Sequence, residues 1–386
     1  MTHYKMSDIA VEVNDRENNP ASSKYDRFVG LEHYVSGEVI IRNYGSTENL
    51  ESTMKIFQSG DVLVARRNVY LKRASMVDFD GLTSGDSIVL RAKNPVIGRI
   101  LPFVFNTDAF WDFADQYSDG TMSKRLSPKT LMTYEFDLPD EDELEKFADL
   151  LWAANDTRES YQALLRQTDE LVKSQFIELF GDPELALTST HTVSEVADVQ
   201  VGIVIKPTRY YADGVKGTKA FRSLNVGTMC VNDADWVYFS DDAMKETQRT
   251  VARTGDVLIV RSGNPGTSCV VTPEYDGCNV IDLIIAHPIK DKILPEYLCA
   301  FTNYPHGMNQ IIGQQRGVAQ KHFNVGLYNQ MKIILPTLEE QRRFVSILKQ
   351  TDKSKFIAYQ ETIFIEKMLK YISSLFPEEK LCSLKM

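Results

Sequence analysis

The chain has 386 residues, 43% of them hydrophobic, which is enough for two or three domains with buried cores. Its 43 Lys and Arg against 53 Asp and Glu give a formal charge of −10, which argues against a chain that is basic throughout and wraps nucleic acid. No apolar run of about 18 residues and no signal-peptide core are present, and the five cysteines include no CxxC pair. We therefore expect a cytoplasmic protein that does not contact a membrane, with reduced thiols and no structural metal.

The first strong element in chain order is SGDVLVAR at 59–66, where a turn dipeptide precedes an alternating β-branched run typical of a buried strand. It returns as TGDVLIVR at 254–261, roughly 195 residues later. Residues 117–139 match 314–336 without a gap. Two weaker anchors are MSDIA (6–10) with VSEVA (193–197), and Leu101-Pro102 with Leu294-Pro295. Matches in the same order at a nearly constant offset predict an internal duplication.

Each repeat is followed by a segment without Pro or Gly in which apolar residues recur at heptad spacing. In 140–180 the seam comprises Leu144, Leu151, Leu165, Val172 and Leu179, with Phe147, Ala154, Tyr161 and Phe176 near the complementary position, and Arg158 interrupts it. In 338–376 it comprises Phe344, Leu348, Thr351, Ala358, Thr362, Ile365, Leu369, Ile372 and Phe376, with Lys355 as the interruption. Helices of this length predict an antiparallel two-helix spacer; the alternative is a pair of amphipathic helices, each lying on its own domain.

The predicted fold class is α+β, with two similar mixed α/β domains separated by two long antiparallel helices and related by a pseudo-two-fold repeat. The boundaries are 1–139 for the first domain, 140–180 for the first helix, 181–336 for the second domain, 337–377 for the second helix and 378–386 for a C-terminal tail. Two similar heads on a stiff spacer suit a ligand with two related faces, and duplex DNA is such a ligand.

Candidate DNA contacts are Arg and Lys, which suit guanine and phosphate, and Asn, which suits adenine. In the first domain they are Arg66, Arg67, Asn68, Lys72 and Arg73 after the first repeated strand, and Lys124 and Arg125 after a glycine. In the second domain they are Arg261 and Asn264 at the matched strand end, Arg316 and Lys321 in the matched loop, and Lys206, Arg209 and Tyr210 near a turn. The alternatives for these residues are solvated strand ends and structural loops.

The acidic residues are concentrated in 140–180, which holds 11 of them against 4 basic ones. So many carboxylates are unfavourable beside phosphate, so we expect this helix to face away from DNA or toward a partner protein, unless it is simply solvated. No P-loop, HExxH or GxGxxG motif is present, so we expect no enzyme activity in this chain.

The order of domain, long helix, domain, long helix resembles the specificity subunit of type I restriction-modification systems. The resemblance rests on QFIELFGDP (175–183) at the end of the first helix, ILPTLEEQRRFVSIL (334–348) at the start of the second, and the two GDVL strands, which are typical of target recognition domains. The first helix departs from the pattern, because DLPDEDELEKF (137–147) lacks the Glu-Gln pair.

The resemblance implies a non-catalytic subunit of a phage-defence complex. Each target recognition domain would bind one half of a split, asymmetric site in double-stranded DNA, and the helices would set the spacer and dock two adenine methyltransferase subunits. S-adenosylmethionine, ATP and Mg would be bound by the methyltransferase and restriction motor-nuclease subunits, with no cofactor in this chain. The remaining alternatives are a free-standing two-headed DNA-binding regulator and a two-headed protein-binding adaptor.

Overall fold

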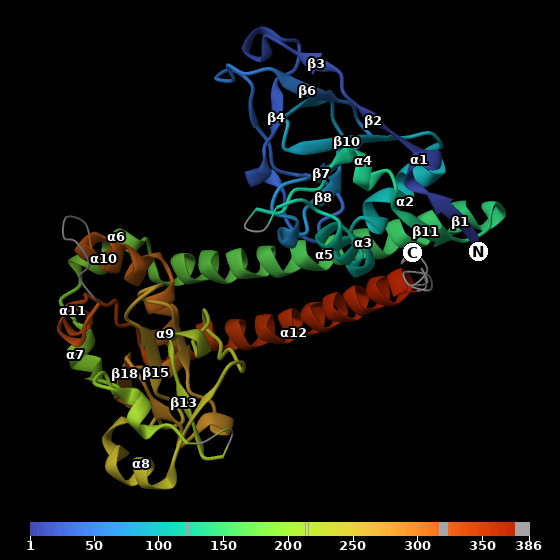
Figure 1. Ribbon diagram of the computed structural model, residues 1–386. Coiled ribbons are helices and arrows are strands. Elements are labelled where there is room, and N and C mark those ends of the chain that lie inside the picture. The colour runs from blue at the N-terminus through green and yellow to red at the C-terminus, as the bar shows by residue number, and fades with distance from the viewer. Residues whose placement is uncertain (121–122, 213, 215, 316–322, 375–386) are drawn as a thin grey trace. The chain divides into compact units, whose positions relative to one another are not determined.

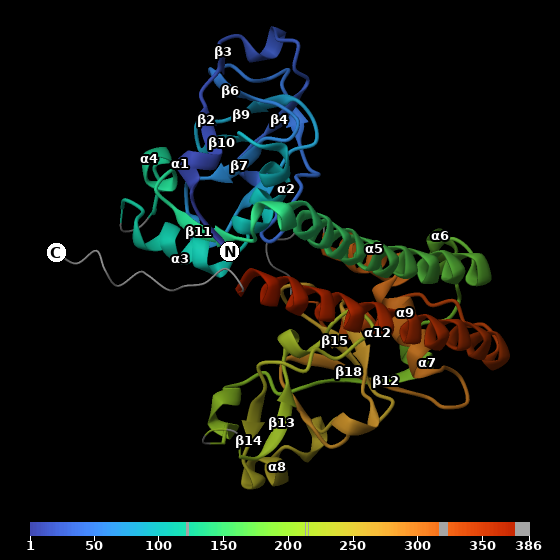
Figure 2. The same ribbon diagram turned by 90° about the vertical axis from the view of Figure 1, so that its right-hand side faces the viewer.

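The computed structural model describes residues 1–386 except 121–122, 213, 215, 316–322 and 375–386. The chain forms two compact units, which Figures 1 and 2 show from two sides. The first comprises residues 1–164 together with the segment from Ile357 onward, and the second comprises residues 165–356. The division passes through both long helices, so each unit contains one head and a part of each helix.

The first unit is built on a four-stranded antiparallel sheet in the order β2-β10-β7-β8. Its strands are β2 (Ala10–Val13), β7 (Val62–Ala65), β8 (Ala74–Met76) and β10 (Ser87–Ala92). Because side chains alternate along a strand, Val62 and Val64 of β7 pack on one side with α2 (Pro95–Val104) and α3 (Asp108–Gln116). Leu63 points to the other side, toward a second sheet. The core is therefore layered, with helices on one face and strands on the other (Figure 1).

The second sheet of this unit has the order β3-β6-β9-β4-β5, in which β4 and β9 are parallel. Its strands are β3 (Arg16–Glu17), β4 (Arg27–Val29), β5 (Gly45–Ser46), β6 (Met54–Phe57) and β9 (Gly81–Thr83). A two-stranded pair, β1 (Thr2–Lys5) with β11 (Glu135–Leu138), and the short helices α1 (Met6–Ile9) and α4 (Pro128–Leu131) complete the head.

The second unit repeats this plan. Its main sheet has the order β12-β18-β15-β16, formed by β12 (Ala197–Val201), β15 (Val257–Val260), β16 (Ser268–Val270) and β18 (Leu283–Pro288). The smaller sheet, β14-β13-β17, again contains a parallel pair, β13 with β17, and comprises β13 (Thr218–Phe221), β14 (Val237–Phe239) and β17 (Asn279–Val280). Its helices are α6 (Pro183–Thr188), α7 (Val193–Val196), α8 (Asp241–Glu246), α9 (Pro295–Asn303), α10 (Pro305–Gln315) and α11 (Val325–Gln330). The same strand order in both units confirms the predicted repeat.

One predicted anchor of the repeat is wrong. Leu101-Pro102 lies inside α2, whereas Leu294-Pro295 begins α9. The counterpart of Pro295 is Pro95, which also occupies the first turn of its helix, where the missing N–H of proline costs no hydrogen bond. The shared dipeptide therefore matched a proline inside one helix with a proline at the start of the other.

The long helices are α5 (Glu141–Phe180) and α12 (Leu338–Ser374). The predicted seams are largely buried. The buried seam residues are Leu144, Leu151, Val172 and Phe176 in α5, and Phe344, Leu348, Thr351, Ala358, Thr362 and Ile365 in α12. Leu369, Ile372 and Phe376 lie outside the residues whose side chains are described. Within the second unit the helices run antiparallel, since Phe176 lies against Phe344 at 5.1 Å between ring centroids and Asp169 pairs with Lys355. The predicted fold class is thus confirmed.

Candidate nucleic-acid interface

The Gly-Asp pair of each repeat forms the same turn. Gly60 and Gly255 both have φ of 91°, a left-handed conformation that favours glycine. The following acids, Asp61 and Asp256, are almost fully buried, and each accepts the main-chain N–H three residues earlier, at 2.8 and 2.7 Å. These bonds fix the turn that precedes β7 and β15. The candidate basic residues come after the other end of each strand.

The two buried acids have different partners at matched positions of β10 and β18. Asp61 accepts two hydrogen bonds of 2.7 Å from Arg91, whereas Asp256 lies 2.6 Å from Nδ1 of His287. The side-chain amide nitrogen of Gln200 lies 2.9 Å from Nε2 of His287, so in the neutral ring Nε2 accepts and Nδ1 carries the hydrogen toward Asp256. The hydrogen bond with Asp256 raises the pKa of His287 above its usual value of 6.5, against the opposing effect of burial.

In the first unit, the structure joins two basic segments that are far apart in the sequence. Arg67 and Arg125 form an antiparallel bridge, and the main-chain N–H of Asn68 donates to the carbonyl oxygen of Lys124 at 2.9 Å. The carbonyl of Arg66 accepts the N–H of residue 126 at 2.8 Å. The residues predicted as two patches therefore form one surface, which we call the first basic cluster: Arg66, Arg67, Asn68, Lys72, Arg73, Lys124 and Arg125.

Acidic side chains neutralise part of the first basic cluster. Asp86 lies 3.1 Å from Arg125 and 3.8 Å from Arg67. Lys72 and Lys124 pair with Asp108 and Asp115 of α3, at 2.7 and 2.6 Å. Pairs that are this exposed contribute about 0–1 kcal/mol each, so phosphate groups can compete for these cations.

Two residues of the cluster are held within the protein. The guanidinium of Arg73 donates to the carbonyl oxygens of Leu31 and Arg67, at 3.0 and 3.1 Å. The Nε atoms of Arg66 and Arg73 are buried and have no hydrogen-bond partner within the described part of the chain. Arg67 and Arg125 are exposed, so within the cluster they are the better placed to reach a base or a phosphate.

In the second unit Arg261 follows β15 as Arg66 follows β7. Its side chain is only 15% exposed, pairs with Asp282 at 2.5 Å and donates to the carbonyl of Phe323 at 3.2 Å. Asn264 is exposed in the turn that follows. Arg316 and Lys321 lie outside the described residues. The contacts of Arg261 are therefore within the protein, and Asn264 is the exposed candidate for contact with DNA on this surface.

The remaining predicted residues lie in the loop before β13. Lys206 is exposed and has φ of 48°. Arg209 lies over the ring of Tyr210, 4.4 Å from its centroid, and donates to its hydroxyl group. Tyr210 itself is buried against Phe239, with ring centroids 5.6 Å apart. Lys206 and Arg209 are accessible, whereas the burial of Tyr210 argues for a packing role; contact of all candidate residues with DNA stays a prediction.

Sequence reasoning did not identify the acid that organises each surface. Asp86 and Asp282 occupy matched positions before β10 and β18, and each pairs with an arginine that follows the matched strand, Arg67 at 3.8 Å and Arg261 at 2.5 Å. The repeat alignment carried this signal, because the offset between the two acids differs by only one residue from the offset between Arg66 and Arg261.

The start of α12 explains the LEEQ motif. Thr337 and Glu340 form a capping box, in which the main-chain N–H of Thr337 donates to Glu340 at 2.8 Å and that of Glu340 donates to the Thr337 hydroxyl at 3.3 Å. Gln341 is fully buried: its Oε1 accepts the N–H of Leu294 at 2.8 Å, and its Nε2 donates to the carbonyls of Lys292 and Pro336 at 3.1 and 3.0 Å. The motif therefore attaches the helix to its own head.

At the start of α5 the matched positions carry other residues. Leu144 takes the place of Gln341 and packs in the apolar core. Asp140, in the place of Thr337, accepts the Thr2 hydroxyl at 2.9 Å. The departure from the family motif is thus an exchange of a polar attachment for an apolar one.

The LFGDP motif ends α5 and anchors it in the second unit. Phe176 and Phe180 lie in the core with Tyr297. Gly181 has φ of 83°, and its N–H closes the helix on residue 177 at 2.7 Å. Its carbonyl lies 2.7 Å from Nε2 of His306. The motif is therefore structural.

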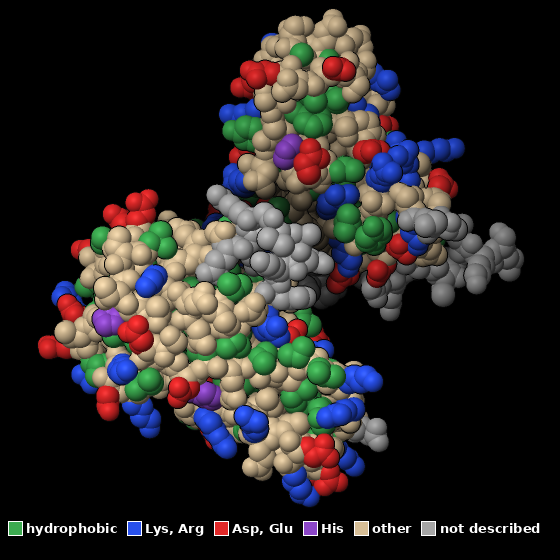
Figure 3. All heavy atoms as spheres, turned by 90° about the vertical axis from the view of Figure 1, so that its left-hand side faces the viewer, with side chains coloured by type: hydrophobic (Ala, Val, Ile, Leu, Met, Phe, Trp, Pro, Cys, Tyr) green, Lys and Arg blue, Asp and Glu red, His purple; other side chains and the backbone are tan. Residues whose placement is uncertain are grey.

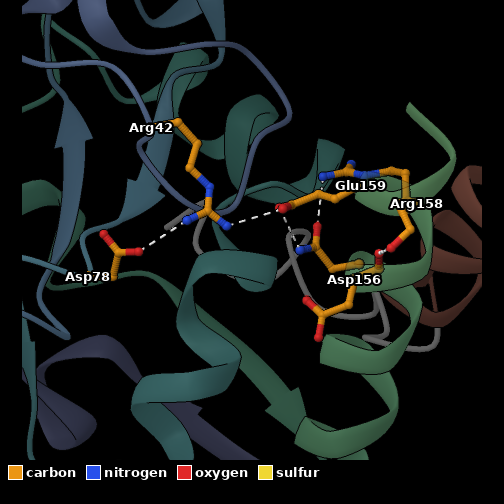
Figure 4. A network of polar contacts seen from close by, with 7 residues as sticks. Arg42, Asp78, Asp156, Arg158 and Glu159 are labelled. Carbon is orange, nitrogen blue, oxygen red and sulfur yellow. Dashed lines mark hydrogen bonds and ion pairs between the residues drawn. The ribbon is translucent and has the colours of Figure 1, made fainter. Parts of the chain in front are cut away.

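The acidic helix α5 contacts its own head in the first unit. Figure 4 shows Arg42 between Asp78 and Glu159, at 3.1 Å from each. Arg99 pairs with Asp149 at 2.7 Å. The expectation that the acids of this helix face away from DNA or toward a partner is therefore incomplete, because two of them bind arginines of the same unit. The acids at 141–143 and 145 are exposed.

No described helix is long and apolar enough to cross a membrane. Residues 230–366 match the family model of the type I restriction modification DNA specificity domain. A comparison with curated proteins finds no match.

Two solved structures have similar folds along nearly the whole chain. One is the type I restriction-modification system S subunit from M. genitalium, with TM-score 0.57, 14% identity, and coverage of 98% of this chain and 96% of that one. The other comes from work on complex assembly and conformational transition of the type I R-M system, with TM-score 0.50, 20% identity and 96% of each chain covered. The family match at 230–366 and these folds confirm the resemblance, expected from the sequence, to the specificity subunits of type I restriction-modification systems.

Proposed function

We propose that the chain is the non-catalytic DNA-specificity subunit of a type I restriction-modification complex, and that each unit recognises one half of a bipartite, asymmetric site in double-stranded DNA. The observation that carries this proposal is the repetition of one sheet-and-helix plan within a single chain, with different side chains at matched positions. A symmetric dimer must present identical heads, whereas a duplicated chain presents two different ones.

The exposed residues supply the chemistry that recognition needs. Arg67 and Arg125 have the fork that matches the O6 and N7 acceptors of guanine, and the amide of Asn264 matches adenine. Lys206 is a point charge suited to phosphate. The acid pairs would hold these side chains in place until phosphates compete for them.

In this proposal the chemistry belongs to partner subunits. Two methyltransferase subunits would bind S-adenosylmethionine and methylate adenine, and restriction motor-nuclease subunits would use ATP and Mg. The long helices would set the spacer between half-sites and present the docking surface for the methyltransferases. One of the two similar solved structures comes from work on complex assembly of the type I R-M system, which supports the expectation of partner subunits.

The deciding experiment is to look for a methyltransferase reading frame beside the one for this chain, to co-express its product with this chain, and to sequence the methylome. We expect modified adenines in a split motif with a fixed gap, and we expect Arg67→Ala to relax one half of the motif only. A chain that binds DNA without supporting methylation would point to a free-standing regulator. A chain that binds no DNA would point to a protein-binding adaptor.

The role of the helices is tested by inserting one helical turn, about 4 residues, into both α5 and α12. We expect a longer spacer with both half-sites unchanged. The matched control inserts the same number of residues at Gly277, a partly exposed turn residue where no neighbouring atom would meet an added Cβ. Altered half-sites, or an unchanged spacer, would contradict this assignment.

Docking on α5 is tested by charge reversal at the exposed Glu141, Glu143 and Glu145. We expect loss of the methyltransferase complex on a sizing column. Reversal at the exposed Glu48 and Glu51 is the control. A complex that still forms with all three acids reversed would rule out this docking surface.

A further inference from the structure

The first basic cluster surrounds a turn that exposes large apolar side chains. A 3-10 turn at Val69–Leu71 lies between Asn68 and Lys72, both left-handed, with φ of 56° and 48°. Tyr70 is 63% exposed, and Leu71 beside it is also exposed. The turn is held on both sides, because the N–H of Asn68 donates to the carbonyl of residue 124 at 2.9 Å and the carbonyl of Lys72 accepts the Ser36 hydroxyl at 3.1 Å. It is therefore a rigid projection.

The second unit presents the same feature from another loop. Val204 and Ile205 are exposed, Ile205 to 76%, and they precede the left-handed Lys206, which begins a 3-10 turn at Pro207–Tyr210. Anchors lie on both sides of the tip. On one side the N–H of Ile203 donates to residue 280 at 2.8 Å, and on the other Tyr210 is buried in the core.

Both projections lie beside the matched arginine and acid. Tyr70 is four residues after Arg66, whose N–H donates to the carbonyl of Asp86 at 2.9 Å. Ile205 follows residue 203, whose carbonyl accepts the N–H of Asp282 at 3.0 Å, and Asp282 pairs with Arg261. Different loops thus place an apolar tip within a few residues of a main-chain bond to the matched acid in each head.

These tips leave apolar area in contact with water in the free protein. Burial of that area on binding would be favourable, at roughly 25 cal/mol per Å². The left-handed Asn68, Lys72 and Lys206 beside the tips carry local strain. The cations around them select the partner, since an apolar protein surface would gain nothing from Arg67, Arg125 or Lys206, whereas duplex DNA offers phosphates around a stack of apolar base faces. Figure 3 shows exposed hydrophobic side chains lying among Lys and Arg, rather than one continuous basic patch.

We propose that Tyr70 and Ile205 are wedges that insert between base pairs of the two half-sites, unstacking one step and bending the duplex there. Inserted apolar side chains flanked by cations act in this way in proteins that kink DNA. The inference rests on the proposed function. It adds that the protein recognises how easily a DNA step is deformed, so flexible pyrimidine-purine steps are preferred where a wedge enters. Each wedge acts on its own half-site.

The test uses the full chain and duplexes that carry the motif found by methylome sequencing, with 2-aminopurine placed at successive steps of each half-site but not at the methylated adenine. Unstacking raises the fluorescence of this base. We expect a signal at one step of each half-site. Ile205→Ala should remove the signal from one half-site and Tyr70→Ala from the other, each with roughly tenfold weaker binding. Ile205→Leu and Tyr70→Phe should retain both.

The control is Leu224→Ala, which removes an apolar side chain of the second unit that is also exposed. All three positions are exposed, so we expect the variants to fold, and unchanged circular dichroism will show that they do. Specific binding without a 2-aminopurine signal, or an equal loss with Leu224→Ala, overturns the wedge and leaves the proposed function intact. Alanine variants that keep the DNA signal but lose the methyltransferase would make the tips protein contacts and also overturn it. If methylome sequencing finds no split motif, the proposed function fails, and the wedge fails with it.

Discussion

Gln341 offers the sharpest test of how α12 is attached to its head. In the Gln341→Leu variant, a side chain of similar volume replaces the amide, and Leu144 shows that leucine fits the matched turn of the other helix. The variant loses three hydrogen bonds and leaves the partly buried N–H of Leu294 without its side-chain partner. At about 1 kcal/mol for each bond, we expect the free energy of unfolding of the second unit to fall by about 3 kcal/mol.

The measurement can be confined to the second unit. The chain has three tryptophans, and Trp236 is the one in that unit. In a background of Trp111→Phe and Trp152→Phe, urea unfolding followed by fluorescence therefore reports the second unit alone. All variants are compared within this background, so its own stability cancels.

Two further variants sharpen the result. Gln341→Glu keeps the acceptor for Leu294 but turns a carboxylate oxygen toward two carbonyl oxygens, so we expect a larger loss that is relieved at low pH. Glu339→Gln, an exposed change two residues away, should alter the free energy of unfolding by less than about 0.5 kcal/mol. If Gln341→Leu also changes the free energy of unfolding by less than about 0.5 kcal/mol, the buried amide does not attach the helix to its head and the reasoning is wrong.

Two other predictions concern the second unit. Because the pKa of His287 is raised above 6.5 in the folded state, its pair with Asp256 stabilises fully below pH 6.5 and loses that contribution as the pH rises through the raised pKa. Urea unfolding from pH 5 to 9 should show this decline, and His287→Arg, which copies the first unit, should abolish it; an unchanged profile would contradict the assignment. Gly202→Ala would place a Cβ 2.4 Å from the carbonyl oxygen of Val280, so we expect a loss of about 2 kcal/mol or more, and an unshifted urea midpoint would exclude that clash.

Local pattern was sufficient to predict the repeated strands and the long helices. A glycine and an aspartate before a β-branched run determine a turn and a buried strand within eight residues, and heptad spacing determines which face of a long helix is buried. The Leu-Pro anchor failed because a dipeptide carries no information about its place in a helix. Pro102 and Pro295 are alike in sequence and differ in the turn they occupy.

The candidate interface was predictable residue by residue but not as a surface. Residues 66–68 and 124–125 meet through main-chain bonds whose partners are more than 50 residues apart, and no periodicity encodes such a pairing. Whether a cation is free or paired likewise depended on distant acids such as Asp86 and Asp108. The burial of Tyr210 depended on Phe239 in another strand. Tertiary contacts decided each of these outcomes.

The two halves of the chain share a buried aspartate, whereas they differ in the residue that pairs with it. Each carboxylate holds a main-chain N–H of its own turn, so losing the acid would disturb the turn and the strand together. The residue that pairs with it holds no part of the turn, and it is arginine in one half and histidine in the other. Distant relatives should therefore be sought by the glycine-aspartate pair with the partner position left open, since that position differs between the two halves.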